Sequence, residues 1–224
     1  MFRVALFDFD GVIVDTEPIH MEAWLDVLEP LGISFDEATY NAQYLGLNDR
    51  DFLDAVLHQA GLQFQAQQKT DLINTKLAVS LSLLQHNIPI LPGVLDFITK
   101  IQPTTKMGIV SGASRSEIDF VLRELELKEY FNPIISAENV KSGKPDPEGY
   151  TTAFQTMKEL HPWNPVLTRD DCLVIEDSPK GIAAAKAAGM RCLATTNSYE
   201  KKDLHQADAL CTTLAEIEPF PIFR

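Results

Sequence analysis

The chain has 224 residues, of which 45% are hydrophobic and 23% charged, a composition typical of a globular protein with one core and room for a smaller second domain. Its formal net charge of −13 argues against nucleic acid and anionic membranes as main partners. No stretch of about 18 apolar residues is present, and acidic residues follow the N-terminus before a signal-peptide core could form, so we expect a cytoplasmic protein.

The first predicted element is a short apolar strand at residues 4–7, which ends at two aspartates. Its sequence, Val-Ala-Leu-Phe, is typical of a strand buried in a parallel sheet that is covered on both faces. Asp8 and Asp10 follow directly, and side chains two residues apart in extended backbone point to the same side. Two carboxylates so close together repel, so the pair indicates a bound cation or a shared proton. A capping pair in an ordinary turn is the alternative.

A block of helices is predicted from about residue 16 to residue 87. Apolar residues recur there at helical spacing, and no convincing strand interrupts them. The periodic stretches are Met21 to Leu31, Phe52 to Ala60 and Leu72 to Leu84. Together they predict a small all-α bundle.

From about residue 88 onward, strand-like and helical segments alternate. The predicted strands cover residues 107–110, 133–136, 172–175, 191–194 and, more weakly, 207–211, and the predicted helices lie near residues 93–101, 114–125, 147–160 and 179–188. Such alternation predicts a doubly wound parallel sheet. The expected fold class is therefore α/β, with a Rossmann-like core of residues 1–15 and 88–224. An all-α domain of residues 16–87 is inserted after the first strand.

Polar residues recur where the later predicted strands end. Ser111 and Gly112 follow the strand at 107–110, Glu176 and Asp177 follow the strand at 172–175, and Lys144 precedes the helix near residue 147. Each has an ordinary explanation as a helix cap or a loop residue. The carboxyl ends of parallel strands, however, meet along the edge of the sheet where ligands bind. The placement therefore predicts one site, shared with the two aspartates of the first strand.

The order of these motifs resembles the haloacid dehalogenase superfamily. Its four motifs match Asp8-x-Asp10, Ser111, Lys144-Pro145 and Glu176-Asp177, and the resemblance covers essentially the whole chain. Ser111 follows Asp8 by 103 positions, whereas Lys144 follows Ser111 by only 33 positions and Asp177 follows Lys144 by 33. The long interval is similar to that of members with a helical cap domain. The segment from Asp8 to His20 resembles the subgroup that contains β-phosphoglucomutase and small sugar-phosphate phosphatases.

The resemblance implies a chemical role for each acidic motif. Asp8 would attack phosphorus to form an aspartyl-phosphate, and Asp10 would act first as general acid and then as general base. Mg²⁺ is the implied cofactor, held by Asp8, the backbone carbonyl of Asp10 and Asp177. Glu176 would either ligate the ion or reach it through water.

The resemblance also implies residues that bind the substrate. Ser111 and the backbone amide of Gly112 would bind phosphate oxygens, and Lys144 would neutralise charge on Asp8 and on the transferring phosphoryl group. In the helical domain, the candidate substrate-binding residues are Thr16, His20, Gly46, Arg50 and Lys76.

The predicted function is Mg²⁺-dependent hydrolysis of a small phosphomonoester, with a sugar phosphate favoured as the substrate. A mutase of the β-phosphoglucomutase type is the main alternative. Mutases of the subgroup carry a Gly-x-Ser-Arg string, whereas this chain has Gly46-Leu-Asn-Asp49-Arg50, with an acid where the arginine should be. A non-catalytic phosphate-binding protein is a less favoured alternative.

Other chemistries are disfavoured by particular residues. Dehalogenases of the superfamily lack the second aspartate of the first motif, so Asp10 argues against carbon–halogen cleavage. No P-loop string is present. The expected partner is a small phosphorylated metabolite, neither nucleic acid nor a membrane, and the sequence leaves the oligomeric state open.

Overall fold

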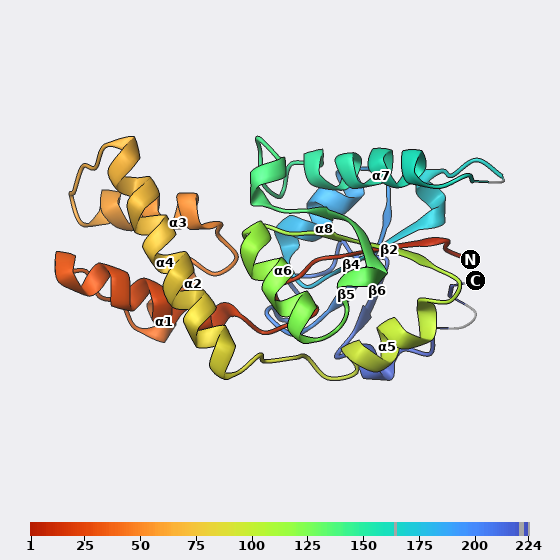
Figure 1. Cartoon of the computed structure of the whole chain (residues 1–224), viewed down its shortest axis with the longest axis horizontal. Coiled ribbons are helices and arrows are strands. Elements are labelled where there is room, and N and C mark those ends of the chain that lie inside the picture. Colours follow the sequence, from red (N-terminus) through yellow and green to blue (C-terminus); the bar gives the residue numbers. More distant parts are fainter. Residues whose placement is uncertain (164, 220–221, 224) are drawn as a thin grey trace. The chain divides into compact units, whose positions relative to one another are not determined.

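The fold is built on a sheet of six strands. The computed structural model describes residues 1–163, 165–219 and 222–223, and in this part of the chain the strands lie in the order β3-β2-β1-β4-β5-β6, with every neighbouring pair parallel (Figure 1). The strands are β1 (Val4–Phe7), β2 (Lys106–Val110), β3 (Phe131–Ile135), β4 (Cys172–Glu176), β5 (Arg191–Thr195) and β6 (Ala209–Cys211). The helices that accompany the sheet are α5 (Val94–Ile101), α6 (Arg115–Glu124), α7 (Glu148–Leu160) and α8 (Pro179–Ala187). The predicted α/β class is confirmed.

β1 occupies the centre of the sheet and is buried on both faces. Val4 and Leu6 point to one side, where they share a core cluster with residues of α7 and α8. Phe7 points to the other side and packs edge-on against Phe97 of α5. All four residues of β1 are fully buried, as an uninterrupted apolar strand predicts.

The strands and helices that form the sheet and its flanking layers begin and end within two residues of their predicted bounds. Capping residues, which can be recognised in the sequence, set the start of two of the helices. α6 begins after Ser114, whose hydroxyl accepts a hydrogen bond from the Glu117 amide at 3.2 Å. α8 begins after Ser178, whose hydroxyl accepts from the Gly181 amide at 3.0 Å, and Pro179 occupies its first position.

The contacts within the chain divide it into two compact units. We call Met1–Asp15 with Pro89–Arg224 the sheet unit, and Thr16–Ile88 the helical unit. The helical unit contains α1 (Glu17–Leu28), α2 (Glu37–Gln43), α3 (Asp49–Gln59) and α4 (Ala66–His86).

The helical unit differs from the sequence prediction at α2 and along α4. α2 has a single buried residue, Tyr40, so it lacks the apolar period by which a helix is recognised. In α4 the predicted apolar stripe is only partly right, because the buried residues are Lys76, Ser80 and Leu84. Lys76 and Ser80 thus lie on the buried face of α4, where the apolar periodicity of the sequence predicted leucines.

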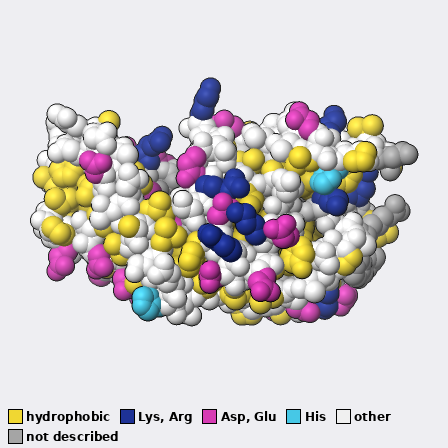
Figure 2. All heavy atoms as spheres, in the orientation of Figure 1, with side chains coloured by type: hydrophobic (Ala, Val, Ile, Leu, Met, Phe, Trp, Pro, Cys, Tyr) yellow, Lys and Arg dark blue, Asp and Glu magenta, His cyan; other side chains and the backbone are white. Residues whose placement is uncertain are grey.

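Basic side chains gather on part of the surface, although the chain as a whole is acidic. Figure 2 shows Lys and Arg side chains gathered over α6, although acids outnumber bases by 32 to 19 in the sequence. Arg115 and Lys128 both pair with Asp119 there, at 3.1 and 3.3 Å. Among the helices of the described residues, none is long and apolar enough to cross a membrane.

Candidate active site

The site begins at the carboxyl end of β1. Asp8 continues the ladder beyond the strand, since its amide donates to the Ile175 carbonyl of β4 at 2.9 Å. The Asp8 Oδ1 atom accepts a hydrogen bond from the Phe9 amide at 2.7 Å. Asp8 is 8% exposed, whereas Asp10 is half-buried. The central strand of the sheet therefore delivers a fixed, nearly buried carboxylate.

Lys144 joins Asp8 to the end of β4. Its Nζ atom lies 2.9 Å from Asp8 Oδ1 and 2.6 Å from Glu176 Oε1. The two carboxylates come from neighbouring strands, and the lysine comes from the loop that precedes α7. One cation thus offsets two buried negative charges.

The Glu176 carboxylate is fully buried and surrounded by protein donors. Its Oε1 atom accepts from Lys144 and from the Tyr150 hydroxyl, the latter at 2.8 Å. Its Oε2 atom accepts from the Asp177 amide at 3.0 Å and from the amide and hydroxyl of Ser178 at 3.1 and 3.0 Å. With five donors around it, Glu176 is anchored in place and in turn anchors Lys144.

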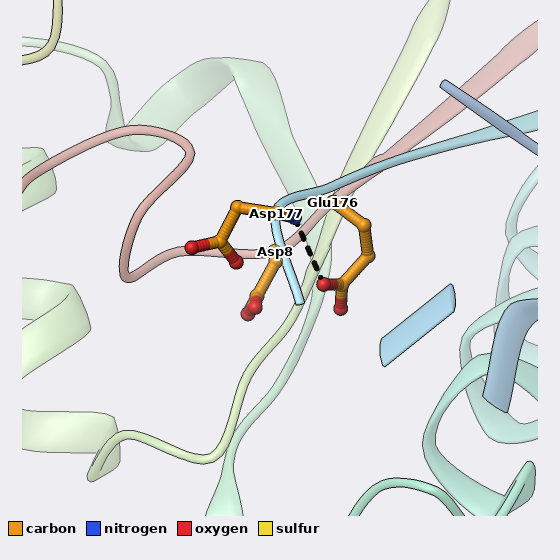
Figure 3. Close-up of side chains that lie close together, drawn as sticks. All are labelled: Asp8, Glu176 and Asp177. Atoms are coloured by element: carbon orange, nitrogen blue, oxygen red, sulfur yellow. Dashed lines mark hydrogen bonds between the residues drawn. The ribbon is translucent and has the colours of Figure 1, made fainter. Parts of the chain in front are cut away.

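Asp177 completes an acidic cluster with Asp8 and Glu176. One carboxylate oxygen of each residue lies within 4.8 Å of the others, an arrangement that could hold a metal ion. Figure 3 shows the Asp177 side chain turned toward Asp8, while the Glu176 side chain extends the other way and accepts from the Asp177 amide. Asp8 and Asp177 are hard oxygen donors, the type that Mg²⁺ prefers.

The close packing of this cluster requires glycine at Gly11. A Cβ atom there would lie 1.9 Å from Asp177 Oδ2, and its φ of +75° is one that side chains disfavour. The tight turn after Asp10 therefore gives the Asp177 carboxylate its space.

Burial dominates the electrostatics of the acids. It raises the pKa of Asp8 to about 8, with the charge of Glu176 adding to the rise and Lys144 opposing it. Burial, followed by the charges of Glu176 and Asp8, likewise raises the pKa of Asp177 well above its usual range. Both pKa values rise because several carboxylates lie close together where little water reaches them, and a bound cation would relieve this repulsion.

The pKa values of the ion pair are shifted in opposite directions. Burial alone would raise the pKa of Glu176, but Lys144, Tyr150 and the Ser178 amide lower it overall. Burial alone would lower the pKa of Lys144, but Asp8 and Glu176 raise it overall. Lys144 and Glu176 therefore remain charged together.

Ser111 lies beside Asp10, as the sequence predicts. The Ser111 hydroxyl is 3.5 Å from Asp10 Oδ2, and it accepts from the Ala113 amide at 2.9 Å. The next residue, Gly112, is exposed, and a Cβ atom there would meet nothing within 4 Å. The end of β2 thus offers a hydroxyl and open space close to Asp10.

Among the candidate residues of the helical unit, Lys76 and His20 contact each other. Lys76 is 1% exposed and lies 2.9 Å from Asp49 Oδ1 and 2.7 Å from His20 Nδ1. Thr16 precedes α1 and is buried, the Gly46 amide donates to the Glu17 carboxylate at 3.3 Å, and Arg50 is exposed in the first turn of α3. His20 and Lys76, far apart in the sequence, are brought together. The roles of these five residues in substrate binding stay predictions.

Two polar contacts of the site were not predicted from the sequence. The Tyr150 hydroxyl of α7 donates to Glu176. Ser198, in the loop after β5, brings its hydroxyl near Asp177, since both groups approach the Cβ position of Gly11. Neither residue belongs to a recognisable string. A tyrosine on the buried face of a predicted helix needs a hydrogen-bond partner for its hydroxyl. That requirement is the one sequence feature that could have pointed to a polar contact of Tyr150.

Comparisons with known proteins identify the family and its relatives. A family model described as haloacid dehalogenase-like hydrolase matches residues 2–189. The chain is 28% identical to a validoxylamine A 7′-phosphate phosphatase of Streptomyces hygroscopicus subsp. limoneus, over 97% of this chain and 96% of the relative. It is 31% identical to a fructose-1-phosphate phosphatase of Escherichia coli, over 83% and 92%. The crystal structure of a β-phosphoglucomutase from Clostridium difficile superposes with a TM-score of 0.83 at 25% identity, over 97% of this chain and 94% of that one.

Proposed function

We propose that this chain, which belongs to the haloacid dehalogenase-like hydrolase family, is a phosphatase that releases inorganic phosphate from a phosphorylated sugar. The observation that carries the proposal is the Asp8 carboxylate, held at the end of the central strand 2.9 Å from the Lys144 ammonium and beside Asp177. Relatives named as phosphatases of validoxylamine A 7′-phosphate and of fructose 1-phosphate support the substrate class.

Asp8 is the nucleophile in this proposal. A carboxylate oxygen of Asp8 forms a bond to phosphorus, the bond from phosphorus to the sugar oxygen breaks, and that oxygen takes a proton from the Asp10 carboxyl. Asp10 then accepts a proton from water, which attacks the aspartyl-phosphate and frees phosphate and the Asp8 carboxylate. Asp10 is half-buried, whereas Asp8 is almost enclosed, and this difference supports the assignment of proton exchange to Asp10.

Mg²⁺ is the proposed cofactor, and the residues present fit it. Asp8 and Asp177 supply hard oxygens within one small cluster, and the raised pKa of each reflects a negative charge that a dication relieves. A bound Mg²⁺ would offset charge on the phosphate oxygens. The five donors around Glu176 support a role for it in holding Lys144.

Lys144 is proposed to stabilise the negative charge that moves during transfer. Its Nζ atom is fixed by two carboxylates, so little reorganisation is needed when a phosphoryl group bonds to Asp8. Ser111 and the Gly112 amide are proposed to bind the phosphate oxygens from the end of β2.

The helical unit favours a phosphatase over a mutase. A mutase must also bind a second phosphate group, which requires cations in addition to Lys144. The buried ammonium of Lys76 is paired with Asp49, the acid that stands where mutases of the subgroup have arginine. The Asp49 carboxylate therefore neutralises the positive charge of Lys76, which a second phosphate group would otherwise need for binding.

The proposal is tested by phosphate release from a panel of sugar and nucleotide monophosphates. We expect turnover of sugar phosphates in Mg²⁺, none in excess chelator, and recovery when Mg²⁺ is restored. Ca²⁺ should restore little, because its looser coordination misplaces the nucleophile and the phosphate. Full activity in chelator would refute the metal site.

A second assay separates the phosphatase from the mutase. The enzyme is incubated with β-glucose 1-phosphate, Mg²⁺ and a trace of the 1,6-bisphosphate. Free phosphate from sugar phosphates without glucose 6-phosphate supports hydrolysis. Rapid formation of glucose 6-phosphate would establish the mutase instead.

A further inference from the structure

The segment from the end of β5 into the following loop contacts the acidic site at two points. The Thr195 hydroxyl lies 3.4 Å from the Gly11 carbonyl oxygen, to which it donates. Three residues later, the Ser198 hydroxyl and the Asp177 carboxylate both approach the backbone of Gly11. None of the four sequence motifs includes this segment.

The packing around Gly11 places the Ser198 hydroxyl and the Asp177 carboxylate in the same small region. A Cβ atom built on Gly11 would lie 1.9 Å from Asp177 Oδ2 and 2.7 Å from Ser198 Oγ. Both oxygens therefore lie over the backbone of Gly11. The Asp177 carboxylate packs against the turn after Asp10, with the Ser198 hydroxyl as its neighbour.

The sheet fixes the position of this segment. β5 lies next to β4, so Thr195 is delivered to the same edge as Asp177, and it is 4% exposed. The Thr196 amide donates to the Cys211 carbonyl of β6 at 3.0 Å, which anchors the start of the loop. Ser198 thus approaches Asp177 from a backbone that is held on two sides.

We infer that Ser198, assisted by Thr195, is a positioning residue that orients the Asp177 carboxylate for a divalent cation. The inference rests on the proposed function. A carboxylate held by a hydroxyl and by the Gly11 turn loses less rotational freedom when it binds an ion. Outer partners of this kind change metal affinity by about 10- to 100-fold when they are removed. Thr195 acts on the same region, because the Gly11 carbonyl adjoins the proposed Asp10 carbonyl ligand.

The test is calorimetric titration of Mg²⁺ into the full chain, freed of metal, as wild type and as Ser198→Ala. We expect Ser198→Ala to bind Mg²⁺ about tenfold more weakly. Ser198→Thr keeps a hydroxyl and should restore most of the affinity. Thr196→Ala removes a hydroxyl from the same loop and should bind Mg²⁺ like the wild type.

A second readout separates positioning from a merely structural role. The Mg²⁺ concentration for half-maximal phosphate release should rise by the same factor in Ser198→Ala, while kcat at saturating Mg²⁺ stays within about twofold of wild type. A structural defect would instead lower the melting temperature without Mg²⁺ and leave the affinity of the folded fraction unchanged.

The outcomes distinguish this inference from the proposed function. If the wild type binds Mg²⁺ and folded Ser198→Ala binds it equally well, the positioning role is wrong and the proposed function stands. If the wild type binds no Mg²⁺, both fail. Should Ser198→Ala not fold, Thr195→Val decides: weaker Mg²⁺ binding supports the inference, and unchanged binding overturns it.

Discussion

Lys144 and Glu176 show how a charged residue is kept in a nearly dry site. The Glu176 carboxylate is fully buried, which would be costly for a lone anion. Lys144 at 2.6 Å and four further hydrogen bonds replace the water that the carboxylate gave up. Because Glu176 is satisfied by the protein, it holds the Lys144 ammonium at a constant distance from Asp8.

Asp8→Asn should remove catalysis while leaving the fold intact. Asparagine has the same shape, and Lys144 keeps its contact with Glu176. The amide is neither a competent nucleophile nor a good cation ligand, so we expect phosphate release to fall by at least about 10³-fold. The measurement is steady-state phosphate release with thermal unfolding as a check of folding. Asp208→Asn, which removes an exposed acid paired with Lys186, is the matched control and should stay active. Substantial turnover by folded Asp8→Asn would rule out Asp8 as the nucleophile.

At the scale of elements, the first turn of α8 is shaped by Glu176. A Cβ atom on Gly181 would lie 1.8 Å from Glu176 Oε1, so the helix approaches the carboxylate as closely as glycine allows. Close approach here lets β4 and α8 share a tight connection.

Gly181→Ala should change the unfolding free energy through two opposing effects. Alanine in a helix is favoured over glycine by about 1 kcal/mol. Overpacking costs about 1–3 kcal/mol, and displacing a buried, paired carboxylate adds to that cost. We therefore expect a net loss of about 2 kcal/mol in unfolding free energy, measured by urea denaturation. Gly112→Ala, where a Cβ atom meets nothing within 4 Å, should change stability by less than about 0.5 kcal/mol. Equal effects of the two substitutions would contradict the clash.

The ion pairs between α3 and α4 offer a second comparison. Asp49 pairs with Lys76, which is 1% exposed, whereas Asp54 pairs with Lys69, which is 33% exposed. Asp49→Ala leaves a buried ammonium without its carboxylate and should cost about 3 kcal/mol. Asp54→Ala should cost less than about 1 kcal/mol. Thermal unfolding of both variants measures the difference, and similar losses would show that Lys76 does not depend on Asp49.

Elements with a clear period were predictable, and those without one were not. The apolar runs of β1 and β4 end abruptly at acids, so both the strands and Asp8 and Asp177 could be placed from the sequence. α2 is short and has one buried residue, so no period marks it. Tyr150 and Ser198 reach the site through tertiary packing, which the spacing of residues along the chain does not reveal.

At the scale of the whole molecule, Arg3 joins the N-terminus to the start of β4. Its guanidinium donates to Asp171 Oδ1 at 3.1 Å and to Oδ2 at 2.8 Å, and also to the Pro165 carbonyl. The amide and hydroxyl of Thr168 donate to the same carboxylate. The hydrogen bonds of Arg3, opposed by burial and helped by Thr168, hold the pKa of Asp171 well below its usual value.

The lowered pKa of Asp171 predicts that the unfolding free energy depends on pH. Because the folded pKa is depressed, the contribution of Asp171 is complete above its unfolded pKa of about 3.9 and is lost as the pH falls below that value toward the folded pKa. Asp171→Asn should therefore cost about 2 kcal/mol of unfolding free energy at pH 7, and its difference from wild type should shrink below about pH 4. Urea denaturation at pH 7, 5, 4 and 3 measures the trend. Asp170→Asn, at the neighbouring exposed acid, is the control. A difference that stays constant down to pH 3 would exclude the ionised pair as its source.

The central position of β1 affects the order in which the chain can assemble during translation. β1 is made first, yet its partners β2 and β4 begin only at Lys106 and Cys172. The helical unit, Thr16–Ile88, is a continuous stretch that is synthesised before either partner. Domains tend to fold as units when they emerge, and pairing between distant strands is slow. The first strand therefore has no partner for about the first half of translation, and Asp8 joins Glu176 and Asp177 only once β4 has emerged.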